Sequence, residues 1–92
     1  MAVYVISIKW ATQPDKAQAA KIEAALAALG DWARLDGGIW FVQTDSNSEA
    51  IYAALSQILL KTDFEIITRV DSLDYKGWLP QWLVNWIAAR IN

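Results

Sequence analysis

The sequence predicts an α+β domain in which one antiparallel sheet packs against helices. Three observations lead to this prediction: four short runs rich in β-branched and aromatic residues, amphipathic segments between them, and a turn signal that joins the middle two runs. The chain has 92 residues, which is enough for one modest hydrophobic core, so we expect a single domain over residues 1–92. Because 55% of the residues are hydrophobic and 20% are charged, a disordered chain is excluded.

The first predicted strand spans residues 3–10, and apolar residues on both of its faces are typical of a central strand. A helix is predicted at residues 12–29, with Thr12 as its N-cap and Pro14 in its first turn. One face of this helix carries apolar residues at helical spacing, namely Ala19, Ile22, Leu26 and Leu29. Gly30 follows and predicts a left-handed end to the helix.

A β-hairpin is predicted after this helix. Its strands are residues 31–35 and 39–44, and Asp36-Gly37-Gly38 between them is a tight-turn signal. The return strand is apolar on both faces over most of its length, which favours a buried position in the sheet.

The second half of the chain repeats the alternation of helix and strand. Ser46 and Glu49 match a capping box at the start of a second helix, and Pro80 suits the first turn of a third. The predicted helix, strand, polar loop and final helix span residues 46–61, 64–70, 71–78 and about 79–91. The resulting order, β-α-β-β-α-β followed by a helix, predicts a ferredoxin-like βαββαβ sandwich with an added C-terminal helix.

The composition excludes several classes of chemistry. The chain contains no histidine and no cysteine, which excludes Ser-His and Cys nucleophile schemes, zinc sites built on those residues, and disulfides. We expect neither a metal site nor a cofactor. The net charge of −2 argues against a highly basic nucleic-acid coat protein. The N-terminus is typical of a strand rather than a signal peptide, and the longest uncharged stretch, 77–89, is too short to span a bilayer, so we expect a cytoplasmic protein that does not bind membranes.

Several short motifs, distributed over nearly the whole chain, resemble those of small SinR-type proteins, which are relatives of the small CRISPR-associated adaptation nuclease. These motifs are Val-Ile-Ser-Ile-Lys-Trp at 5–10, Leu-Gly-Asp-Trp at 29–32, Ile-Trp-Phe-Val-Gln-Thr-Asp at 39–45, Gly-Trp-Leu-Pro at 77–80 and Trp-Leu-Val-Asn-Trp at 82–86. The resemblance implies a ferredoxin-like dimer. In the adaptation-nuclease relatives, an aspartate at the end of the first strand is the proposed metal ligand at the dimer axis. Lys9 stands at the matching position here, and an ammonium group cannot bind Mg²⁺. The resemblance therefore implies a nuclease-like protein that lacks this site and has no catalytic activity of its own.

Three strand cations are candidate contacts for nucleic acid or another anion. They are Lys9, Arg34 and Arg69, and in a twisted sheet some of them could converge beside Trp32 or Trp40. Such a groove would resemble a platform on which single-stranded bases stack. The simpler interpretation is a set of scattered surface cations in water or in weak salt bridges.

The C-terminal helix carries the most distinctive pattern in the sequence, because tryptophans recur there at every fourth position. Its broad apolar arc is the candidate dimer or packing interface, and it comprises Trp78, Leu79, Trp82, Leu83, Trp86 and Ile87. Two interpretations compete: the whole arc packs on its own sheet, or part of it covers a partner subunit. The arc is wider than one packing face needs, which favours a homodimer.

These observations favour a small, dimeric, non-catalytic interaction module that binds nucleic acid weakly or binds a protein partner. A defence, toxin–antitoxin or mobile-element setting is implied only by the resemblance. One alternative is a divalent-metal nuclease that uses other carboxylates, with Asp45 and Asp71 as the first to test. Another is a structural or assembly protein that adheres through its tryptophan-rich helix.

Overall fold

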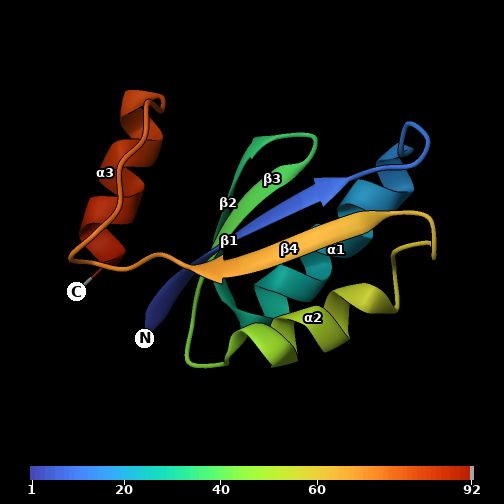
Figure 1. Ribbon diagram of the computed structural model, residues 1–92, viewed down its shortest axis with the longest axis horizontal. Coiled ribbons are helices and arrows are strands. Elements are labelled where there is room, and N and C mark those ends of the chain that lie inside the picture. The colour runs from blue at the N-terminus through green and yellow to red at the C-terminus, as the bar shows by residue number, and fades with distance from the viewer. Residues whose placement is uncertain (92) are drawn as a thin grey trace.

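The computed structural model describes residues 1–91, which form an α+β structure with a four-stranded antiparallel sheet and three helices (Figure 1). In chain order the elements are β1 (Ala2–Lys9), α1 (Lys16–Leu29), β2 (Gly30–Asp36), β3 (Ile39–Thr44), α2 (Ser48–Ser56), β4 (Phe64–Arg69) and α3 (Gln81–Arg90).

The strands lie in the order β2-β3-β1-β4, and every neighbouring pair is antiparallel. β1 pairs with β3 through residues 2–7 and with β4 through residues 4–9. The prediction of a central first strand is therefore confirmed. β2 and β4 are the two edges of the sheet, and both are open to further pairing within the described residues.

The larger part of the core lies between the sheet and the helix pair α1 and α2. Its buried residues are Tyr4, Ile6, Ile8, Ile22, Leu26, Trp40, Val42, Ile51 and Leu55. Trp40 is completely buried, and its indole Nε1 donates a hydrogen bond to Oε2 of Glu23 at 3.2 Å. This bond satisfies a polar group that would otherwise be costly to bury.

α3 covers the opposite face of the sheet and lies apart from α1 and α2 (Figure 1). A second buried cluster forms there, in which Leu83 and Ile87 pack on Val3, Ala33 and Phe41. The sheet is therefore sandwiched between two helices on one side and one on the other. No helix formed by residues 1–91 has the length and apolar character needed to cross a membrane.

The helices begin slightly later than the sequence pattern predicts. Asp15, rather than Thr12, caps α1 by accepting a hydrogen bond from the backbone N–H of Gln18 at 2.8 Å. Asn47, rather than Ser46, caps α2. In both cases a short Asx side chain one residue before the helix reaches the free N–H groups of the first turn.

α2 is also shorter than predicted, because it ends at Ser56 and not near Lys61. The following turn is held by Asp63, whose Oδ2 accepts from the N–H of Leu60 and whose Oδ1 accepts from the N–H of Ala11. One side chain thus ties the end of α2 to the segment after β1, a tertiary contact that overrides the helical pattern.

The predicted left-handed conformation of Gly30 is wrong. Gly30 has φ 164° and ψ −158°, which is extended backbone, and it is the first residue of β2. A side chain here would collide with the backbone carbonyl oxygen of Gln43 on β3. Glycine is required at this position because two strands approach closely, rather than because the helix must turn.

Candidate functional site

The three candidate cations lie on different parts of the sheet. Lys9 is the exposed last residue of β1 and pairs in register with Phe64. Arg34 lies on the edge strand β2, where its Nη1 forms an ion pair with Oε2 of Glu23 at 3.2 Å. Arg69 ends the other edge strand, β4, and pairs in register with Tyr4.

This placement keeps the cations apart. β3 and β1 separate the strands that carry Arg34 and Arg69. Lys9 lies on the α3 side of the sheet, because strand residues alternate and Val3 packs in the α3 cluster. Of the two expected stacking partners, Trp40 is buried in the core and Trp32 is partly buried against the same core. The structure therefore brings neither the three cations nor an exposed aromatic platform together.

The candidate interface residues of the C-terminal segment divide into three groups. Leu83 and Ile87 are buried against the chain's own sheet, and Leu79 and Trp86 are partly buried beside them. Trp78 is 100% exposed and Trp82 is 51% exposed. Only part of the predicted apolar arc packs against the rest of the chain.

Trp86 belongs to a small polar cluster at the β2 side of α3. The guanidinium carbon of Arg90 lies 4.4 Å from the centre of the Trp86 ring, and Nη2 of Arg90 lies 3.6 Å from Oδ2 of Asp31. A cation over an aromatic face is an attractive pair that holds the end of a helix in place. These contacts anchor the end of α3 to β2.

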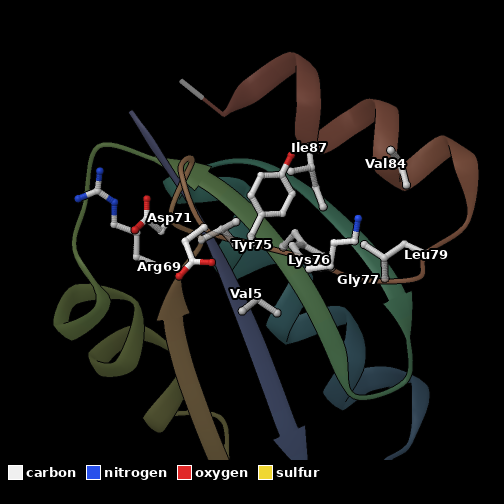
Figure 2. Close-up of a pocket in the computed structure, with 12 residues that line it drawn as sticks. Val5, Arg69, Asp71, Tyr75, Lys76, Gly77, Leu79, Val84 and Ile87 are labelled. Atoms are coloured by element: carbon white, nitrogen blue, oxygen red, sulfur yellow. The ribbon is translucent and has the colours of Figure 1, made fainter.

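A groove opens on the other side of α3, between this helix, the sheet and the segment that connects β4 to α3 (Figure 2). Its volume is about 690 Å³. The apolar residues that line it are Val5, Phe41, Val70, Tyr75, Leu79, Val84 and Ile87. Figure 2 shows Val5 of β1 on one side, Val84 and Ile87 of α3 on the other, and Tyr75 between them.

The groove also has four charged lining residues, Arg69, Asp71, Asp74 and Lys76, and their formal charges cancel. Asp71 acts as a turn former, because its Oδ1 accepts a hydrogen bond from the N–H of Leu73 at 2.9 Å. The groove therefore combines apolar walls with a charge-balanced mouth, and this favours an uncharged occupant with apolar side chains over a phosphate backbone.

A second, smaller pocket of about 390 Å³ lies beside the edge strand β4. It is lined by Ser48, Glu49, Tyr52, Glu65, Ile66 and Ile67. Within it, Oε2 of Glu65 accepts a hydrogen bond from the Ser56 hydroxyl at 3.2 Å, whereas Oε1 is buried without a hydrogen-bond partner among residues 1–91. Burial raises the pKa of the Glu65 carboxyl above its ordinary value, and the Ser56 hydrogen bond acts in the opposite direction.

The carboxylates considered for metal chemistry are not gathered into a site. Asp45 is highly exposed and lies 3.9 Å from the amino terminus, and Asp71 is engaged in its turn. Among residues 1–91, no three acidic side chains are placed to hold one metal ion.

Comparison of the chain with models of known protein families gives no match, and comparison with curated protein sequences gives none either. Only the surfaces of the molecule therefore indicate its function. Sequence reasoning did not find the groove, because its walls come from β1, β3, the connecting segment and α3. Tyr75 and Lys76 lie in a stretch that has the composition of an ordinary polar loop. The sequence does not indicate Glu65 either, since a lone glutamate on a strand carries no recognisable pattern.

Proposed function

We propose that this chain is a non-catalytic interaction module that binds an apolar segment of another protein in the groove beside α3. The observation that carries the proposal is the groove itself, which has a volume of about 690 Å³ and mainly apolar walls. Protein interfaces are built around such desolvated apolar pockets, which receive a few large side chains of the partner.

The exposed aromatic residue next to the groove supports the same proposal. Trp78 is 100% exposed and stands between Gly77 and Leu79, both of which line the groove. Tryptophan is strongly enriched among residues that dominate binding energy, because it removes a large apolar area from water. A tryptophan exposed at the lip of an apolar groove fits a contact with a partner chain.

Charge favours protein over nucleic acid as the partner. Nucleic-acid affinity depends on several cations that contact phosphates together. Here Lys9, Arg34 and Arg69 lie on different strands, and Arg34 is already paired with Glu23. The net charge of −2 opposes long-range attraction of a polyanion.

We infer further that the fold is the ferredoxin-like βαββαβ arrangement with an added C-terminal helix. The order of the elements and the sheet order β2-β3-β1-β4 support this inference. We also propose that the protein forms homodimers, that it is cytoplasmic, and that it descends from SinR-type, nuclease-like proteins. The proposed loss of the ancestral metal site depends on Lys9, which ends β1 where the relatives carry an aspartate.

The binding proposal is tested by placing a photoreactive amino acid at Val84 in the groove, and at the exposed Ala17 on α1 as the matched control. Irradiation in the natural host cells should give a discrete protein adduct from position 84 and none from position 17. The adduct should disappear when Tyr75→Ala is added, and the same pair should be reproduced with the purified partner. Equal adducts from both positions, or none from position 84, would refute binding in the groove.

A second measurement separates protein from nucleic acid. Fluorescence anisotropy with single- and double-stranded DNA and RNA, at low and moderate salt with Mg²⁺ present, should show no salt-sensitive binding. Running the probes on a gel afterwards should show no cleavage. Salt-sensitive binding weakened by Lys76→Glu would contradict the proposal and assign the groove to nucleic acid.

A further inference from the structure

The two edge strands of the sheet differ in how well they are protected against pairing with another strand. β2 carries Asp31, Arg34 and Asp36, and its register with β3 shifts between Arg34 and Asp36. Charges and bulges of this kind are the usual devices that block an edge. β4 pairs with β1 in a regular register over its full length, contains no lysine or proline, and carries two charges of opposite sign, Glu65 and Arg69.

β4 also exposes apolar side chains at this edge. On the α3 side of the sheet, Phe64 is 69% exposed and Ile66 is 65% exposed. A regular edge strand with exposed apolar residues is a template for another strand.

The hydrogen-bonding groups at this edge are assigned by alternation along the strand. The N–H of Val70 donates to the carbonyl of Val3 at 2.8 Å, so Val70 and every second residue before it face β1. Glu65, Ile67 and Arg69 consequently direct their N–H and C=O groups away from the sheet. These three residues are the ones that can bond to an incoming strand.

By alternation, the same three residues face the side of the sheet that α1 and α2 cover, because they pair in register with core residues of β1. Arg69 is the last residue of the strand and also borders the groove. Glu65 brings a buried Oε1 that lacks a hydrogen-bond partner among residues 1–91. Arg69 is exposed and forms no ion pair within the same range. A carboxylate with one unpartnered oxygen and an arginine without an ion pair thus lie two residues before and two residues after Ile67.

We propose that two copies of this chain associate through β4, antiparallel about a two-fold axis at Ile67, with Arg69 of each copy opposite Glu65 of the other. The two sheets then form one continuous eight-stranded sheet, and each arginine enters the pocket that Glu49 and Glu65 line on the other copy. The two copies are complementary in charge, because the two-fold rotation places Glu65 of each copy opposite Arg69 of the other.

Charge also selects this register over its neighbours. The N–H and C=O groups that point away from β1 belong to every second residue of β4. An antiparallel pairing that bonds these groups to each other can therefore shift only in steps of two residues. Such a shift places Glu65 opposite Ile67 in one direction and opposite Asp71 in the other, so both alternatives lose the ion pair. In the proposed register, Ile66 lies opposite Thr68 of the other copy on the α3 side, which removes exposed apolar surface from water.

The first experiment is sedimentation velocity from micromolar to millimolar protein, with charge-swap variants. We expect a dimer for the natural sequence and about a tenfold or greater loss of affinity for Arg69→Glu or Glu65→Arg, because each places like charges opposite one another. The variant with both substitutions should recover the dimer. Lys76→Glu changes the charge equally but lies outside β4, and it should leave the dimer intact.

Circular dichroism identifies any variant that fails to fold. If Glu65→Arg does not fold, the exposed Arg69→Glu still provides the test. The proposal is overturned by a monomeric natural chain at all concentrations, by a folded double variant without recovery, or by an equal effect of Lys76→Glu. Arg69 and Lys76 also border the groove, whereas Glu65 does not, so Glu65→Arg tests the dimer without changing a groove residue. Binding in the groove is tested separately at Val84 and Tyr75.

A second experiment reads the register directly, because the natural chain contains no cysteine. An equimolar mixture of the Ile66→Cys and Thr68→Cys chains should form a disulfide-linked pair of one copy each under mild oxidation. Each variant alone should cross-link much more slowly, since its cysteines stand diagonally across the axis. Preferential cross-linking of one variant with itself would refute this register.

Discussion

Leu83→Ala should destabilise the protein more than Trp82→Ala, although leucine is a much smaller side chain than tryptophan. Leu83 is 0% exposed between α3 and the sheet, and a buried leucine truncated to alanine costs about 2–5 kcal/mol. We expect about 3 kcal/mol, because the cluster on this face is small and α3 is able to relax toward the sheet.

Trp82 is 51% exposed, so folding removes only about half of its roughly 200 Å² from water. At about 25 cal/mol per Å² this burial contributes at most about 2.5 kcal/mol. Alanine retains part of that burial and the unfolded chain already has some of it, which leaves an expected cost of about 1–2 kcal/mol.

The assay is urea unfolding followed by circular dichroism at a helix wavelength, since fluorescence itself changes when a tryptophan is removed. Asn85→Ala, an exposed change on the same helix, is the control and should alter the free energy of unfolding by less than about 0.5 kcal/mol. A cost of Trp82→Ala equal to that of Leu83→Ala would refute the packing of α3 on the sheet through Leu83. The tryptophan side of the helix would then be the buried one.

Three further predictions concern single contacts. Gly30→Ala should destabilise by more than about 2 kcal/mol in urea unfolding, because its methyl group meets a backbone carbonyl of β3, whereas Gly37→Ala, with open space around it, should be nearly neutral. Glu23→Ala should cost about 1–3 kcal/mol by the same assay, since it leaves the buried indole N–H of Trp40 without its acceptor; a change near zero would mean that this bond is unimportant. Burial raises the pKa of Glu65, which means that the folded state favours the protonated carboxyl. The stability that this preference gives to the dilute monomer is fully present below the ordinary pKa of 4.5 and is lost as pH rises through the raised pKa. Glu65→Gln should therefore be more stable than the natural chain above that pKa and lose its advantage at acidic pH, and an advantage independent of pH in unfolding titrations would contradict this cause.

The local elements followed from residue patterns because their causes are local. The β-branched runs around Val5 and Ile67 form strands, and the apolar spacing of Ile22 and Leu26 places both in the core. Ends of elements were less well predicted where a distant contact decides them. α2 stops early because Asp63 ties the next turn to Ala11, a contact that spans 52 residues.

The candidate site was predicted only in part. The helical spacing of the C-terminal segment identified Leu83 and Ile87, and both lie in an apolar cluster. Spacing alone did not reveal that Trp82, on the same predicted arc, would stay half exposed. The periodicity of a helix indicates an apolar side, but the surface that this side meets is set by the neighbouring sheet.

The sequence by itself determined the α+β class, the central position of β1 and the absence of histidine and cysteine chemistry, because composition and periodicity act over a few neighbouring residues. Only the tertiary structure decided which surfaces remain open. The separation of Arg34 from Arg69, the groove around Tyr75 and the unpaired oxygen of Glu65 depend on which strands become neighbours and on where α3 packs. These are contacts between segments distant in the chain, and no local pattern of side chains encodes them one by one.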